Sequence, residues 1–332
     1  MSDDPNLFDF ATSELSQDAI LCWMAKWAEA RYAAVDPLLH KLGRDFLSLM
    51  LAKHERILQE TVEKLVVRRQ FKHIDVLLEV DDFLLISIED KVGTSEHSGQ
   101  LARYLSELQA LGHPSIQILP IYVQTGNQSS FKQVEKQGYR VVNRGDFVRL
   151  FSTYLVSGGR SDIISNYYRY LLNIEAQFRG FCDRPLDKWT WWNWIGFYSA
   201  IQERVIDGSW NYVPNQSGGF LGFWWAGVGD NGFHWYLQLE ETDLVVKIGV
   251  NEKSGRSAIR DSCLRRVLSV ARSMDLPFKR PGRVGHGQTM TVAVLASAYR
   301  RVDASGRLDM EATLAVLRDA ELLIRRCPSE SA

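Results

Sequence analysis

Acidic and basic side chains follow one another closely between residues 75 and 91. Asp75 stands near the start of the apolar run IDVLLEV, and a Glu89-Asp90-Lys91 triplet closes the next run, FLLISIEDK. Two apolar runs of strand length separated by a pair of aspartates predict a β-hairpin. Side chains alternate along a strand, so Glu89 and Lys91 point to one side and Asp90 to the other. If Asp75 shares the side of Glu89, two carboxylates and an ammonium meet at the open end of the hairpin. Such a group suits a divalent cation bound by oxygen atoms, beside an anionic substrate.

This pattern resembles the PD-(D/E)XK nuclease superfamily, whose signature is an acid in one strand and acid-x-Lys in the next. Asp75 and Glu89-Asp90-Lys91 stand at those places, although Ile74 replaces the proline that usually precedes the first acid. Gln100 and Tyr104 reproduce the Gln-x-x-x-Tyr pattern of the RecB-like branch. Residues four apart share one face of a helix, so both side chains can turn toward the strand ends.

The resemblance implies a role for each of these residues. The implied ligands of Mg²⁺ or Mn²⁺ come from four acidic residues: Asp75, Glu89, Asp90 through its backbone carbonyl, and Glu14. Lys91 would orient the attacking water or neutralise charge on the phosphate, and Gln100 and Tyr104 would position the phosphate or that water. Glu14 has a second interpretation, because acids are favoured at helix N-termini by the helix dipole alone. The implied activity is metal-dependent hydrolysis of phosphodiester bonds, in DNA rather than RNA, for defence or repair.

The elements expected to position these residues form an α-β-β-β-α-β series in the first half of the chain. A helix from residue 12 to about 30 has Leu15, Ala19, Cys22, Trp23 and Trp27 on its apolar face. Residues 62–67 could end a helix or begin a strand, and the resemblance favours a strand. The hairpin strands from Phe71, a helix with Ser95 as its cap, and a buried strand over 116–124 follow. We therefore predict an α/β fold with a restriction-endonuclease-like core, in a nuclease-like domain spanning residues 1–178.

The second half differs in composition and predicts an accessory α+β domain over 188–332. Eight of the ten tryptophans fall between Trp189 and Trp235. They fit core packing better than base stacking. The stretch GVGDNG at 227–232 matches a dinucleotide-binding fingerprint, but a strand pattern follows it where phosphate binding needs a helix, so we interpret it as a hairpin loop. This domain would select the substrate, gate access or form an oligomer.

Local basic patches are the candidates for nucleic-acid contact, since the whole chain has a net charge of −1. Residues 247–283 hold ten basic and three acidic residues. Four arginines are the predicted nucleic-acid contacts. Arg256, Arg260 and Arg265 lie in this stretch, and Arg103 lies in the first half of the chain. Arg256 and Arg260 share a helical face, as a phosphate-contacting pair would. A solvated helix face explains the same pattern equally well.

Length and composition limit the remaining possibilities. A chain of 332 residues with 45% hydrophobic content suits two globular domains. Four scattered cysteines and the absence of a signal peptide or long apolar run predict a reduced cytoplasmic protein without a membrane segment. A homodimer is an open option. The competing function is a non-catalytic binding or sensor module that keeps the nuclease fold and acts through its C-terminal domain.

Overall fold

The computed structural model describes residues 4–93, 99–111, 116–215, 218–230 and 232–328. The chain forms two compact units, residues 1–175 and 176–332, each with its own hydrophobic core. The fold is mixed α/β. No helix in the described ranges is long and apolar enough to span a membrane.

The first unit is built on a five-stranded sheet in the order β1-β2-β3-β4-β5. Its strands are β1 (Leu65–Phe71), β2 (Ile74–Val80), β3 (Leu84–Lys91), β4 (Gln117–Gln124) and β5 (Arg140–Asn143). The pairs β1–β2 and β2–β3 are antiparallel, whereas β3–β4 and β4–β5 are parallel. Strand β4 lies inside the sheet, which confirms the prediction of a buried strand over residues 116–124.

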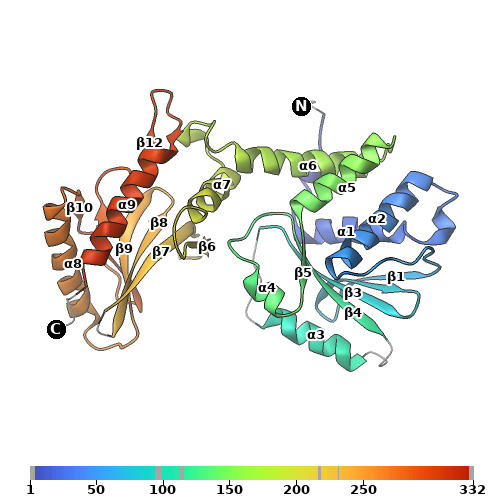
Figure 1. Ribbon diagram of the computed structural model, residues 1–332, viewed down its shortest axis with the longest axis horizontal. Helices are drawn as coiled ribbons and strands as arrows, with labels where there is room; N and C mark the ends of the chain where they lie inside the picture. The colour runs from blue at the N-terminus through green and yellow to red at the C-terminus, as the bar shows by residue number, and fades with distance from the viewer. Residues whose placement is uncertain (1–3, 94–98, 112–115, 216–217, 231, 329–332) are drawn as a thin grey trace. The chain divides into compact units, whose positions relative to one another are not determined.

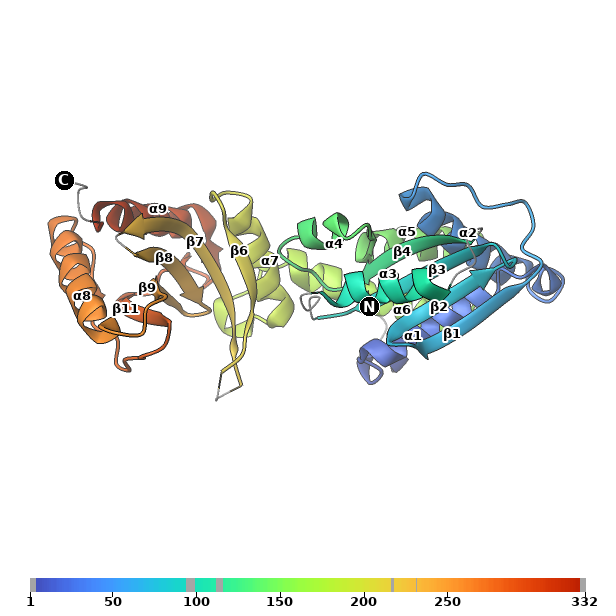
Figure 2. The same ribbon diagram turned by 90° about the horizontal axis from the view of Figure 1, so that it is seen from below.

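Helices cover both faces of this sheet (Figures 1 and 2). They are α1 (Glu14–Lys26), α2 (Pro37–Lys53), α3 (Gln100–Leu111), α4 (Lys132–Lys136), α5 (Arg144–Val156) and α6 (Asp162–Arg179), with short 3-10 turns at Leu7–Asp9 and Ala30–Tyr32. Helices α1, α2, α5 and α6 share the main core with one sheet face. Helices α3 and α4 lie on the other face over two smaller clusters.

Local signals in the sequence explain where several of these elements begin. The Ser13 side chain caps α1, and the Asp36 side chain accepts the backbone N–H groups of Leu38 and Leu39 at the start of α2. The first hairpin strand begins later than predicted. Phe71 ends β1, and Lys72 and His73 turn the chain with φ of 50° and 70°. Ser95, expected to cap α3, lies outside the described residues.

The second unit has a six-stranded antiparallel sheet in the order β10-β11-β9-β8-β7-β6. Its strands are β6 (Ser209–Val213), β7 (Phe220–Asp230), β8 (Phe233–Glu240), β9 (Asp243–Val250), β10 (Phe278–Lys279) and β11 (Thr289–Leu295), with a small separate pair β12 (Arg301–Val302) and β13 (Leu308–Asp309). Its helices are α7 (Trp191–Gln202), α8 (Arg256–Ser273) and α9 (Met310–Arg326), after a 3-10 turn at Leu186–Lys188. All three helices pack into one core with the sheet.

The glycine-rich stretch at 227–232 joins two strands, as expected, but two of its glycines are part of a strand. Gly227 and Gly229 lie in β7, which forms an antiparallel hairpin with β8. Residue 231 lies outside the described part of the chain. The described residues therefore offer a strand where dinucleotide phosphates require a helix N-terminus.

Candidate active site

The β2–β3 hairpin brings Asp75, Glu89 and Lys91 together, as the strand alternation predicts. Val76 pairs with Ile88, so the next residues outward, Asp75 and Glu89, come side by side at the end of the hairpin. The Lys91 ammonium donates to Glu89 Oε1 at 2.6 Å and lies 3.7 Å from Asp75 Oδ2.

Backbone atoms of Asp90 complete this arrangement. Its N–H donates to Asp75 Oδ2 at 2.8 Å, which fixes the first acid against the second strand. Its carbonyl oxygen accepts a hydrogen bond from the Lys91 ammonium at 2.9 Å. Oxygen atoms of Asp75, Glu89 and Asp90 therefore surround one cationic nitrogen.

Burial and mutual repulsion shift the pKa values at this site. Glu89 is 2% exposed, and burial, followed by the negative charge of Asp75, raises the pKa of its carboxyl to about 7, against the opposing effect of Lys91. Burial alone would lower the pKa of the Lys91 ammonium, but the charge of Glu89 and its hydrogen bond outweigh that effect, so the pKa is raised. Lys91 therefore stays protonated at neutral pH, while Glu89 is close to its midpoint.

Helix α1 adds Glu14 to the same region. The Glu14 carboxylate accepts the backbone N–H of Val92, directly after Lys91, at 3.3 Å. Its charge contributes to the raised pKa of Glu89. Glu14 thus lies beside the end of β3, where the resemblance placed it, and it also occupies the first turn of α1, where the helix dipole favours an acid.

The Asp90 side chain points away from this group, into a buried polar network on the α1 side of the sheet. Gln17 Nε2 donates to Asp90 Oδ1, and Gln17 Oε1 accepts hydrogen bonds from Thr125 Oγ1 and the Tyr167 hydroxyl, at 2.6 and 2.5 Å. Burial raises the pKa of Asp90 well above its ordinary value. Gln17 therefore ties the strand that carries the triplet to α6 and to the end of β4.

A second connection runs through Gln70 and Asp18. Gln70 Nε2 donates to both Asp18 Oδ2 and Asp75 Oδ1, at 3.0 Å in each case. Burial and the nearby charge of Asp75 raise the pKa of Asp18 to about 6. Gln70 thereby orients the carboxylate of Asp75, with Asp18 holding the Gln70 amide from α1.

The sequence did not indicate Gln17 and Asp18, because the predicted apolar face of the first helix is only partly the buried one: Cys22, Trp23 and Trp27 pack against the core, whereas Leu15 and Ala19 are exposed. Leu15, predicted to be apolar and inward, is 53% exposed, whereas Gln17 and Asp18 are 3% and 1% exposed. They line up with Leu21, which is fully buried. The one available signal was this pair of polar residues three and four positions before Leu21, and it is ambiguous without knowledge of Asp90.

The structure describes the side chain of Tyr104 but not that of Gln100, the other predicted residue of this helix. Gln100 begins α3, but its side chain lies outside the described residues. Tyr104 is buried and packs with Ile74 and Leu77 of β2, and the His73 ring stacks on it at 6.3 Å. This packing supports the strand that carries Asp75. The roles of Gln100 and Tyr104 with phosphate or water, and the RecB-like branch itself, stay predictions.

The predicted nucleic-acid arginines have different environments. Arg103 is exposed, with its guanidinium 5.2 Å from the Tyr104 ring centroid, on the side of the sheet that carries α3. Arg265 is exposed on α8. Arg260 is 7% exposed and binds the Gly285 carbonyl and its neighbour Asp261. Arg256 donates to the carbonyls of residues 251 and 252. The guanidinium groups of Arg260 and Arg256 are thus used in hydrogen bonds within the protein. Contact with nucleic acid stays a prediction for all four arginines.

The donor set is compatible with a divalent cation. Two carboxylates and a backbone carbonyl already gather around the positive charge of Lys91, and Mg²⁺ is commonly held by one or two carboxylates with water completing its shell. Within the described ranges, no three His, Cys, Asp or Glu side chains converge as a complete metal cage. Asp75, Glu89 and the Asp90 carbonyl would hold such an ion, with Glu14 beside them.

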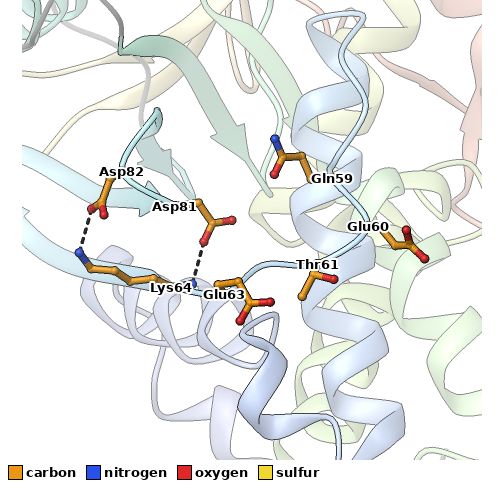
Figure 3. Close-up of a pocket in the computed structure, with 7 residues that line it drawn as sticks. All are labelled: Gln59, Glu60, Thr61, Glu63, Lys64, Asp81 and Asp82. Carbon is orange, nitrogen blue, oxygen red and sulfur yellow. Dashed lines mark hydrogen bonds and ion pairs between the residues drawn. The ribbon is translucent and has the colours of Figure 1, made fainter.

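A cavity of about 540 Å³ lies elsewhere on this unit (Figure 3). It lies at the closed end of the hairpin, opposite to the end that holds Asp75, and is lined by Gln59, Glu60, Thr61, Glu63, Lys64, Asp81 and Asp82. Lys64 forms an ion pair with Asp82 at 2.8 Å, and its N–H donates to Asp81. These contacts hold the turn, and the cavity is separate from the catalytic candidates.

Comparison with known proteins gives one match. A family model described as "PD-(D/E)XK nuclease superfamily" matches residues 5–174, which is just over half of the chain and includes all of β1 to β5. No curated protein and no solved structure matches the chain.

Proposed function

This chain belongs to the PD-(D/E)XK nuclease superfamily, and we propose that it is a metal-dependent nuclease acting on phosphodiester bonds of DNA. The observation that carries the proposal is the convergence of Asp75, Glu89 and the Asp90 carbonyl on the Lys91 ammonium. The proposed cofactor is Mg²⁺ or Mn²⁺. Bound there, the ion would polarise the scissile phosphate and lower the pKa of a bound water.

The side chains and backbone groups of the site would bind the cation and stabilise the charge that develops on the phosphate. Asp75 and Glu89 supply negative charge that attracts the cation, and the hydrogen bonds from Asp90 N–H and Gln70 keep Asp75 in one orientation. Lys91 remains protonated, so its ammonium can turn from Glu89 to a phosphate oxygen as negative charge develops there. A cation that takes over Glu89 and the Asp90 carbonyl would release Lys91 for this role.

A basic surface beside the site supports a nucleic-acid substrate. Lys72, His73 and Arg103 are exposed near the turn that precedes Asp75. His73 and Arg103 both contact the ring of the buried Tyr104. We propose that these three cationic or titratable groups bind the phosphates that flank the cleaved bond.

Cleavage assays with matched variants test the proposal. Supercoiled plasmid, single-stranded DNA and RNA are incubated with Mg²⁺ or Mn²⁺ and the wild type, Asp75→Asn or Lys91→Met. Glu79→Gln is the control, because Glu79 lies on β2 and pairs with the exposed Arg68. We expect a loss of about 100-fold or more with each site variant, and none with the control.

Equal cleavage by all four proteins would reject the proposal. Calorimetry that detects no binding of Mg²⁺ or Mn²⁺ to the wild type, with or without DNA, would favour the binding or sensor module instead. The choice of DNA over RNA, the homodimer and the cytoplasmic location stay predictions.

A further inference from the structure

The sheet of the second unit has one face in the core and one turned away from it. Three alternate residues of β8 are buried in the core with helices α7, α8 and α9: Trp235, Leu237 and Leu239. The residues that alternate with them, His234, Tyr236 and Gln238, lie on the opposite face, because side chains alternate along a strand. That face carries rings and polar groups that the core does not use.

A cavity of about 490 Å³ opens on this face. Its lining includes Trp224, His234, Tyr236, Gln238 and Gly227, and one acid, Asp207. Trp224 of β7 is the cross-strand partner of Gln238, so the indole and the amide stand next to each other. The volume and the mixture of aromatic and hydrogen-bonding groups are typical of a site for a small planar molecule.

The rings present flat surfaces. The His234 and Tyr236 rings stack with centroids 5.7 Å apart and planes 22° apart. A Cβ on Gly249 of the neighbouring strand would lie 2.1 Å from His234 Cε1, so the imidazole lies directly on the backbone of that glycine. His234 is exposed, so its ring can also be reached by a planar group from solvent.

An irregularity in β7 shapes the cavity. The pairing with β8 shifts register between Trp225 and Val228, and Ala226 has a φ of 54°, which is uncommon for a residue with a side chain. Bulges of this kind often lie beside binding sites, where they redirect side chains. The bulge leaves Gly227 at the cavity, where an added Cβ would meet no atom within 4 Å.

Basic side chains lie on the same face, together with acids. A neighbouring cavity of about 670 Å³ includes Lys279, Arg283 and Val245 in its lining. Val245 is the cross-strand partner of Gln238, so the two cavities adjoin. Lys279 and Arg283 are exposed, and residues 279–288 contain no acid. The second cavity also has two acids in its lining: Glu240, which is paired with Lys247 at 2.7 Å, and Asp243, which is exposed.

We infer that this face binds single-stranded nucleic acid, with a base stacked in the aromatic cavity and the backbone along Lys279 and Arg283. Stacking of bases on aromatic rings, with basic side chains along the backbone, is the general means of holding single strands. Duplex bases are paired and stacked on each other, so they cannot enter the cavity. The inference rests on the proposed function for its ligand, because a nuclease meets nucleobases in its substrate.

Fluorescence anisotropy in EDTA, where no metal-dependent cleavage occurs, tests the inference with a short labelled oligothymidylate. Gly227→Phe fills the cavity, whereas Gly227→Ala leaves it open and serves as its control. Trp224→Ala removes a stacking ring, and Trp191→Ala removes a partly exposed tryptophan of α7 that does not line the cavity. We expect about 10-fold weaker binding with Gly227→Phe and Trp224→Ala, and wild-type binding with the two controls.

Three results would overturn the inference: unchanged binding by Gly227→Phe, equal or tighter binding of a duplex of the same length, or displacement of the oligomer by thymidine monophosphate at the same nucleotide concentration. The last would identify a site for free nucleotides. Circular dichroism of each variant checks that it is folded. Cleavage by the wild type, measured separately with Mg²⁺, shows whether the proposed nuclease activity fails independently of this binding site.

Discussion

Replacing Glu89 with glutamine should make the metal-free protein more stable above neutral pH. The wild-type carboxyl has a pKa of about 7 in the folded chain, compared with an ordinary value of 4.5. Glutamine has nearly the same shape, can still accept a hydrogen bond from Lys91, and has no charge to bury. The side chain that the proposed nuclease needs is therefore one that weakens the fold.

The size and direction of the effect follow from linkage. A folded pKa above the unfolded value means that the contribution of Glu89 to stability is complete below about pH 4.5 and is lost as the pH rises through about 7. A difference of that size corresponds to about 3 kcal/mol. Because Glu89 is 2% exposed, solvent screening reduces this only slightly. The variant should match the wild type near pH 4.5 and exceed it by up to about 3 kcal/mol near pH 8.

Urea denaturation followed by circular dichroism, at several pH values and in EDTA, measures this difference. Glu79→Gln is the matched control, since Glu79 lies on the neighbouring strand in an ion pair with Arg68. Adding Mg²⁺ should then stabilise the wild type and leave Glu89→Gln unchanged.

A stability difference that does not vary with pH would refute the reasoning, as would a variant less stable than the wild type near pH 8. Either result would mean that Glu89 is ionised in the folded protein at little cost. The Lys91 ammonium would then compensate its burial fully.

Three further changes test other parts of the structure. Gly43→Ala should lower the free energy of unfolding, measured by urea denaturation, by about 2 kcal/mol, because the added Cβ would lie 2.5 Å from the backbone nitrogen of Ala28 where α2 crosses α1. An unchanged urea midpoint would show that the two helices can separate freely. Arg144→Ala should lower the free energy of unfolding by about 3 kcal/mol in the same measurement, since it removes a buried guanidinium that pairs with Glu175 at 2.7 Å. A loss smaller than about 1 kcal/mol, the most that an exposed ion pair usually contributes, would contradict this. Mg²⁺ at about 100 times its dissociation constant should raise the free energy of unfolding by about 3 kcal/mol, and Asp75→Asn should abolish the gain; an equal gain in both proteins would place the ion elsewhere.

The sequence predicted the hairpin and its two faces because both depend on local rules. Two apolar runs around a short polar turn form a hairpin, and a period of two assigns Glu89 and Lys91 to one face and Asp90 to the other. The same kind of local rule explains why α1 and α2 begin after Ser13 and Asp36, where a side chain caps the first backbone N–H groups. None of these features requires knowledge of distant residues.

The surroundings of the acids could not be predicted in this way. Gln17 and Asp18 are buried because Asp90 and Gln70, more than fifty positions away, supply their hydrogen-bond partners. A polar side chain with no known partner is expected outside, so the sequence does not predict the burial of Gln17 and Asp18. The pKa of Glu89 is equally a product of burial and neighbours.

The sequence alone thus determined which residues are available for chemistry and on which side of their strand they lie. Only the tertiary structure decided which of them are buried, which hydrogen bonds orient Asp75, and which face of the second sheet is left open beside Trp224 and His234. The physical reason is one of range. Alternation and capping act between neighbours in the chain, whereas burial and hydrogen-bond pairing depend on segments that meet only when the chain folds.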